Sequence, residues 1–141
     1  MGSGMGNAFQ DRVGAALEVN LQRSLNPELV DLADPAAGVR FPVRGLAVTP
    51  FGALHAGALG AIIELAAYLA VAPTLAADEH AVTTSIATQF ARAAPAEHWV
   101  TVRGELTRRA RRIAFVVVTA TLDSTDQVIA TGQVTKSVVS V

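Results

Sequence analysis

The sequence contains no cysteine, which excludes a disulfide framework, a zinc site built from thiolates and a cysteine nucleophile. Charged residues are scarce at 16%, and hydrophobic residues make up 51%, a composition that excludes a disordered chain. Eleven Lys and Arg nearly balance twelve Asp and Glu, and the formal net charge of -1 argues against a broad nucleic-acid-binding face. Any anion-binding site must therefore be local.

The length of 141 residues is typical of one domain. We expect residues 1–6 to be an expression remnant or a disordered terminus, and residues 7–141 to form a single domain. No export signal is visible at the N-terminus, and with the lack of cysteine this favours the cytoplasm. Residues 53–77 have the length of a membrane span, but Glu64 and Pro73 interrupt an Ala-rich and Gly-rich segment. We therefore predict a buried helix and no membrane partner.

The hydrophobic periodicity predicts two helices and five strands. An amphipathic helix capped by Asn7 is expected to end at Asn26, with Leu21 and Leu25 on its apolar side. A first strand is expected within residues 38–50, with a kink at Gly45, followed by an apolar helix over residues 56–72. The remaining strands are expected at residues 81–90, 99–107, 112–122 and 128–139. Because their connections are short, we expect these four strands to form an antiparallel meander.

Glu64 is the most informative residue, because a carboxylate inside an apolar helix is unfavourable without compensation. Gly57, Gly60, Ala61 and Ala67 are its neighbours at helical spacing, which predicts a groove with a floor of small residues. A substrate lying in that groove would meet a carboxylate suited to general-base catalysis. The alternative is a structural glutamate that is satisfied by a backbone amide or an arginine.

Two further features suggest binding of a polarised or charged group. His55 is followed by Ala56 and Gly57 at the start of the predicted helix, where free N–H groups could stabilise an oxyanion, although His55 could simply cap the helix. Four arginines cluster at a turn between strands and suit phosphate binding; they are Arg108, Arg109, Arg111 and Arg112. A turn whose arginines are only solvated would have the same sequence pattern. No residue spacing indicates a metal site, and we expect no cofactor.

The segment Pro50-Phe51-Gly52-Ala53-Leu54-His55-Ala56-Gly57, followed nine residues after His55 by the acidic Glu64, resembles the hotdog-fold acyl-CoA thioesterases. The resemblance is greatest to their PaaI-like and hydroxybenzoyl-CoA thioesterase branches. It implies an α+β hotdog fold, in which an antiparallel sheet wraps around a long central helix, here with an added N-terminal amphipathic helix. It also implies an acyl-CoA substrate.

The same resemblance implies roles for individual residues. Glu64 would act as general base or nucleophile, the Ala56 amide in the turn with His55 and Gly57 would form the oxyanion hole, and Thr83 would face the acidic residue. The implied substrate-binding residues are Thr49, Phe51, Tyr68, Arg92, Arg108, Arg109, Arg111 and Arg112. Three of the positions depart from the family pattern: Ala56 replaces a glycine, Thr49 an amide side chain, and Tyr68 a small hydroxyl residue.

Helix geometry predicts a site shared between subunits. Glu64 lies eight residues after Ala56, which is about 12 Å along a helix at about 1.5 Å per residue, too far for both to contact one carbonyl group. We therefore expect a homodimer, assembled further as a dimer of dimers. The leading function is hydrolysis of an aryl-CoA or fatty acyl-CoA thioester. The alternatives are a weakly active or non-catalytic acyl-CoA-binding protein and, less favoured, a hydratase.

Overall fold

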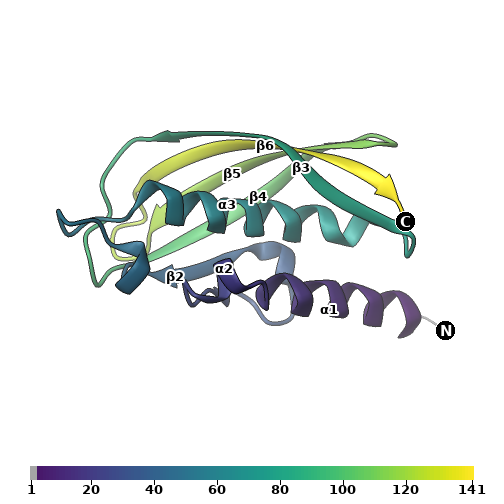
Figure 1. Cartoon of the computed structure of the whole chain (residues 1–141), viewed down its shortest axis with the longest axis horizontal. Helices are drawn as coiled ribbons and strands as arrows, with labels where there is room; N and C mark the ends of the chain where they lie inside the picture. Colours follow the sequence, from purple (N-terminus) through teal and green to yellow (C-terminus); the bar gives the residue numbers. More distant parts are fainter. Residues whose placement is uncertain (1–2) are drawn as a thin grey trace.

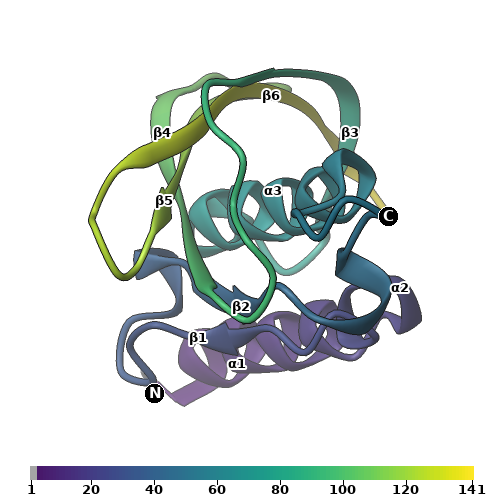
Figure 2. The same cartoon turned by 90° about the vertical axis from the view of Figure 1, so that its left-hand side faces the viewer.

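One long helix lies against the concave face of a curved antiparallel sheet, as the computed structural model shows in two orthogonal views (Figures 1 and 2). The structure describes residues 3–141, with side chains from residue 8 onward. The helices are α1 (Ser3–Leu17), α2 (Asn20–Arg23) and α3 (Ala56–Val71). The strands are β1 (Glu28–Leu29), β2 (Val39–Pro42), β3 (Glu79–Phe90), β4 (Trp99–Arg109), β5 (Ile113–Leu122) and β6 (Val128–Ser140).

The central helix α3 confirms the helix predicted from its apolar sequence. Eleven of its sixteen residues are buried, and it ends where Pro73 lies in the short 3-10 helix Ala72–Thr74. Gly104 on β4 permits close contact with the sheet, since a Cβ there would lie 2.8 Å from the Ala66 carbonyl oxygen. The segment Ala56–Thr74 is apolar enough to cross a membrane, but 67% of its most apolar window is buried in the protein, as in a core helix.

The strand order is β1-β2-β4-β5-β6-β3, with every neighbouring pair antiparallel. β4, β5 and β6 form the predicted meander, but the prediction that β3 joins it next to β4 is wrong. β3 pairs with β6 at the sheet edge. The connection over residues 91–98 therefore passes β6 and β5 before the chain enters β4. Backbone hydrogen bonds from Leu54 to Ala94 and from Ala96 to Gly52 hold this connection against the turn before α3.

The first predicted strand is shorter than expected. β2 covers only Val39–Pro42, and residues Gly45–Ala47 form a 3-10 helix rather than a kinked strand. Gly45 adopts a φ of 54°, which a strand does not accommodate and which glycine adopts readily. The chain therefore turns away from the sheet here and approaches the N-terminus of α3.

The N-terminal helix also differs from the prediction. α1 begins at Ser3, so that Asn7 lies inside it and not at its cap, and the helix stops at Leu17. Val19 has an extended backbone, with φ -59° and ψ 127°, before the separate single turn of α2. This break changes the helical phase: Leu21 is 60% exposed, whereas Gln22 is buried. The prediction that Leu21 lies on the apolar side of the helix is therefore wrong, whereas Leu25 is buried as predicted.

Candidate functional site

Glu64 lies on the one face of α3 that the sheet leaves uncovered. Gly57 is exposed, and Gly60, Glu64 and Tyr68 are half-buried, at the three- and four-residue spacing of one helical face. A Cβ placed on Gly60 would have no atom within 4 Å, so that the space before Glu64 is open. The predicted small-residue floor is thus present at Gly57 and Gly60, whereas Ala67 is fully buried on the core side.

The Glu64 carboxylate is held by a short chain of hydrogen bonds. The Thr83 hydroxyl donates to Glu64 Oε1 at 3.2 Å, and Lys136 Nζ donates to Thr83 Oγ1 at 2.7 Å. Thr83 lies on the edge strand β3, next to an irregularity in the β3–β6 register. The structure therefore places Thr83 where the resemblance expected it, facing the acidic residue.

Lys136 is the component of this site that the sequence interpretation missed. It is 2% exposed, on β6 between the buried Val134 and Val138, and its ammonium group lies 5.8 Å from the centre of the Tyr68 ring. Burial lowers the pKa of Lys136, and the nearby Glu64 charge opposes that shift. A sequence signal did exist, because Lys136 is the only lysine beside ten arginines and occupies an inward position in an alternating strand.

A pocket of about 480 Å³ opens beside Glu64, between α3 and the N-terminal helices. Its walls are mainly apolar, with Val19 and Leu21 on one side and Leu65 and Tyr68 on the other. Burial raises the pKa of the Tyr68 hydroxyl, and the charge of Arg12 partly offsets this effect. Arg12 itself is engaged by three backbone carbonyls of the segment after α3, which ties α1 to the core. The pocket has the size and lining of a small-ligand site.

The predicted oxyanion turn has a defined geometry at the start of α3. His55 is the N-cap residue, and its Nδ1 accepts a hydrogen bond from the Gly57 N–H at 2.9 Å. Within the described residues, no acceptor contacts the Ala56 N–H, which is exposed at the positive end of the helix dipole. Ala56 therefore keeps an amide available for a developing negative charge, whereas the Gly57 amide is already used.

The turn before α3 contains the other two residues predicted there. Thr49 Oγ1 accepts weak hydrogen bonds from the N–H groups of Phe51 and Ala53, at 3.3 and 3.4 Å, so that Thr49 shapes the turn. Phe51 is 95% exposed. Neither side chain lines the pocket beside Glu64 of the same chain.

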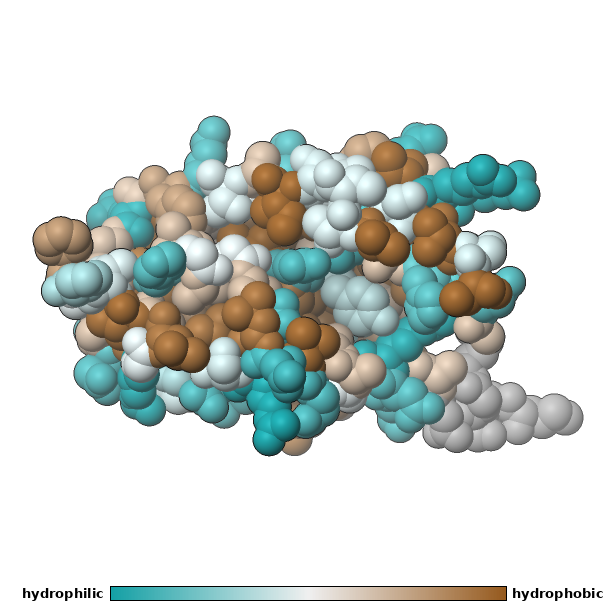
Figure 3. All heavy atoms as spheres, in the orientation of Figure 1, coloured by the Kyte–Doolittle hydropathy of each residue, from teal (hydrophilic) through white to brown (hydrophobic). Residues whose placement is uncertain are grey.

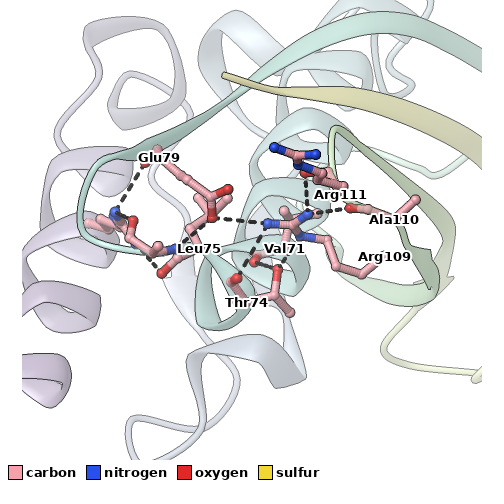
Figure 4. A network of polar contacts seen from close by, with 9 residues as sticks. Val71, Thr74, Leu75, Glu79, Arg109, Ala110 and Arg111 are labelled. Carbon is pink, nitrogen blue, oxygen red and sulfur yellow. Dashed lines mark hydrogen bonds and ion pairs between the residues drawn. The ribbon is translucent and has the colours of Figure 1, made fainter. Parts of the chain in front are cut away.

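The arginine turn does not present four equivalent cations. Figure 4 shows Arg109 directed into a polar network, where its guanidinium pairs with Glu79 at 3.1 Å and contacts Thr74 at 3.0 Å. Arg108, Arg111 and Arg112 are exposed. Arg111 and Arg112 line a shallow hollow of about 420 Å³ together with residues of β6. These partners hold Arg109 within the protein, and its predicted contact with substrate stays a prediction.

Arg92 lies far from that turn within one chain. It follows the C-terminal end of β3, whereas the arginine turn lies at the C-terminal end of α3 and near the start of β3. The predicted phosphate-binding arginines are therefore divided between the two ends of the sheet. No group of three His, Asp or Glu side chains that could hold a metal occurs in the described part of the chain.

Comparison with known proteins places this geometry in a family. A thioesterase family protein from Silicibacter pomeroyi is 19% identical over 94% of this chain and 99% of its own, with a TM-score of 0.82. A mutant of the phenylacetic acid degradation protein PaaI from Thermus thermophilus is 23% identical over 84% of this chain and 98% of its own, with a TM-score of 0.74. A Bacillus halodurans protein crystallised with CoA is 16% identical over 97% of this chain and 87% of its own, with a TM-score of 0.78.

These similarities show the expected α+β hotdog fold. No curated protein sequence matches the chain. The family profile described as Thioesterase superfamily matches residues 51–129, which include the turn before α3, Glu64 and Thr83. The chain therefore belongs to the thioesterase superfamily.

Proposed function

We propose that the protein hydrolyses the thioester bond of an aryl-CoA or fatty acyl-CoA, with Glu64 as general base or nucleophile. The observation that carries the proposal is a half-buried carboxylate on an otherwise apolar helix, oriented by Thr83 and facing a mainly apolar pocket. Family membership supports thioester chemistry, and the presence of CoA with the Bacillus halodurans protein supports a CoA ester as substrate.

In the general-base route, Glu64 removes a proton from a water molecule that attacks the thioester carbonyl carbon. The carbonyl oxygen becomes an oxyanion, which the Ala56 N–H stabilises. The C–S bond then breaks, and the CoA sulfur leaves and takes up a proton. In the nucleophilic route, Glu64 attacks the carbonyl carbon directly, the C–S bond breaks, and the CoA thiolate leaves and takes up a proton. Water then hydrolyses the resulting anhydride, which releases the acid and regenerates the Glu64 carboxylate. In both routes the Thr83 hydroxyl donates a hydrogen bond to Glu64 Oε1, which leaves Oε2 free for the reaction.

The active site is proposed to combine two chains. Glu64 and Ala56 lie at different turns of the same helix, about 12 Å apart along its axis, so one carbonyl group cannot contact both. A partner helix running antiparallel would bring its Ala56 amide to Glu64 and would create two equivalent sites. The proposed assembly is a homodimer that pairs further as a dimer of dimers.

The edge of the sheet provides a surface for this dimer. β3 is twelve residues long, and in the described chain no strand covers its outer edge. It exposes three large apolar side chains, Val82, Ile86 and Phe90, at 52%, 41% and 50%. Figure 3 shows that apolar residues also reach the surface at several places on one face. Since Thr83 on β3 contacts Glu64, a partner at this edge would lie beside the site.

The phosphates of CoA are proposed to bind the exposed arginines, with Arg111 and Arg112 as the main pair and Arg92 at the other end of the sheet.

The lack of cysteine is compatible with the proposed cytoplasmic location, where thiols stay reduced.

A panel of aryl-CoA and fatty acyl-CoA thioesters, assayed for release of free thiol, tests this function. Turnover of at least one class that depends on enzyme concentration is expected. Tight binding of the whole panel without thiol release would instead indicate an acyl-CoA-binding protein.

A further inference from the structure

Lys136 is a buried cation that the two proposed reaction routes do not use. It is 2% exposed and lies on β6 between the buried Val134 and Val138. Burying an ammonium group is unfavourable, and an apolar side chain of similar volume, such as methionine, would avoid that cost. The stability of the fold therefore does not account for a lysine at this position.

The charged and ionisable groups around Lys136 leave Glu64 as its counter-charge. Glu64 and Tyr68 face it from α3, and Arg12 of α1 lines the same pocket. On the neighbouring strand β3, Glu79 is already engaged in an ion pair of its own. The other neighbouring strand, β5, has no ionisable side chain between Ile113 and Leu122. Lys136 and Glu64 thus form a pair of opposite charges separated by one hydroxyl group.

The direction of both hydrogen bonds in this chain is fixed by the groups at its ends. An ammonium group can only donate, and an ionised carboxylate can only accept. The oxygen of Thr83 accepts from Lys136 at 2.7 Å, so its single hydroxyl proton is directed to Glu64 Oε1 at 3.2 Å. The shorter contact is the one to Lys136, which anchors Thr83 from the side of the cation. Without that cation, the Thr83 hydroxyl is free to rotate away from Glu64.

We propose that Lys136 is a positioning residue, whose ammonium group holds the Thr83 hydroxyl as a donor to Glu64 and so fixes the carboxylate for thioester hydrolysis. This inference rests on the proposed thioesterase function. Lys136 reaches Glu64 only through Thr83, and it acts without contacting the substrate. Its loss should therefore lower kcat and leave the affinity for substrate unchanged.

The first test replaces only the ammonium group. The chain has no cysteine, so Lys136→Cys introduces a single thiol that can be alkylated in the unfolded protein before refolding. Alkylation with 2-bromoethylamine restores an ammonium group at the length of lysine, whereas 1-bromopropane gives the same shape with a methyl group in its place. The propyl form should have a kcat about fivefold to tenfold below wild type, the effect of one hydrogen bond. The aminoethyl form should be close to wild type.

Equal kcat values for the two folded forms would overturn the proposal, because a side chain that merely fills space is replaced equally well by either group. Arg103→Cys, at an exposed position of β4, is the control for the chemistry. Its aminoethyl and propyl forms should turn over substrate equally.

Binding separates positioning of Glu64 from damage to the pocket. The probe is a CoA thioether in which a methylene group lies between the sulfur and the acyl carbonyl, so that it cannot be hydrolysed. The aminoethyl and propyl forms should bind this probe with the same Kd. A propyl form that loses affinity as much as it loses kcat would contradict the proposal, since the substituted side chain would then shape the binding site.

A double-mutant cycle tests the route through Thr83 with variants that need no alkylation. Lys136→Met should lower kcat by the same fivefold to tenfold in the wild-type background, the effect of about one hydrogen bond. In the Thr83→Val background it should cause no further loss, because the hydroxyl that transmits its effect is absent. Equal losses in the two backgrounds would show that Lys136 acts independently of Thr83 and would overturn the proposal.

Failure of the proposed function would give a different result. If wild type releases no thiol from any thioester, the hydrolase proposal falls, and the role of Lys136 is tested by crystal structures of the two alkylated forms. In the aminoethyl form, the Thr83 hydroxyl should contact Glu64 as in wild type. In the propyl form, it should have rotated away from the carboxylate. An unchanged contact between Thr83 and Glu64 in the propyl form would refute the positioning role.

Discussion

Lys136 is linked to Glu64 through a single hydroxyl group: its ammonium donates to Thr83 Oγ1 at 2.7 Å, and Thr83 donates to Glu64 Oε1 at 3.2 Å. The cation is 2% exposed, whereas the carboxylate is half-buried and reaches the pocket. The positive charge behind Thr83 therefore supports the position of the proposed catalytic group without blocking its access to substrate.

Replacing Glu64 tests the proposed chemistry. Glu64→Gln keeps the shape of the side chain and removes the base or nucleophile, and kcat should fall by about a hundredfold or more. Thiol release from the best CoA thioester measures the effect. Glu105→Gln, at an exposed position of β4, is the matched control and should retain turnover. Turnover of Glu64→Gln close to that of wild type, with an unchanged circular dichroism spectrum, would rule out the catalytic role.

Lys136 should titrate below 10.5, because its burial disfavours the charged form. Since it is the only lysine, its labelled side chain gives one NMR signal whose shift with pH reports the pKa directly. Glu64→Gln should lower this pKa further, because the Glu64 charge favours the ammonium form. A titration at or above 10.5 in wild type would show that the side chain is solvated.

The lowered pKa of Lys136 also predicts how stability varies with pH. Below the folded-state pKa both states hold the proton, and the unfavourable burial of the cation is present in full. As pH rises from the folded-state pKa to 10.5, the folded state is neutral while the unfolded state still binds the proton, so this group adds stability. The Tm of wild type should therefore rise relative to that of Lys136→Met as pH increases through this window. A constant difference in Tm would contradict the buried charge.

Within the arginine turn, Arg111 and Arg112 should contribute to CoA binding, whereas Arg109 should contribute to the stability of the protein. Arg111→Ala combined with Arg112→Ala should raise KM for CoA thioesters by about tenfold with little change in kcat, because these contacts lie far from the reacting carbon. Arg109→Ala should instead lower stability by about 1–2 kcal/mol, since it breaks the partly buried pair with Glu79. Steady-state kinetics and urea unfolding distinguish the two effects. An unchanged KM in the double variant would identify the turn as merely solvated.

Mixing two inactive variants tests the shared site. Ala56→Pro removes the proposed oxyanion N–H at the first residue of α3, where proline is tolerated and where the extended backbone of His55 suits a following proline. After co-refolding with Glu64→Gln chains, mixed dimers would contain one intact site and one doubly altered site. Random assembly should restore about one quarter of wild-type activity. Mixed dimers without activity, or an active monomer in sedimentation, would contradict the arrangement.

The sequence was sufficient for the elements whose pattern is strong. The helix over residues 56–72 was predictable because it is apolar on all faces and ends at Pro73, and Glu64 was conspicuous as the one carboxylate within it. β5 lacks such a one-sided pattern. Residues 113–118 are apolar on both faces, so the pattern does not reveal that Val116 and Val118 are buried while Phe115 and Val117 remain 38% and 37% exposed.

Tertiary structure decided the features that depend on contacts between distant segments. β3 lies at the sheet edge, and the connection that follows it, over residues 91–98, is hydrogen-bonded to the turn before α3, more than 35 residues earlier in the chain. Lys136 and Thr83 meet Glu64 only through the β3–β6 pairing. Gln22 is buried and Leu21 is exposed because the break at Val19 rotates the following turn by an amount that helical periodicity does not predict. Local pattern therefore determined the long elements, α3 and β3 to β6, whereas the pairing of strands and the packing of helices determined which side chains surround Glu64.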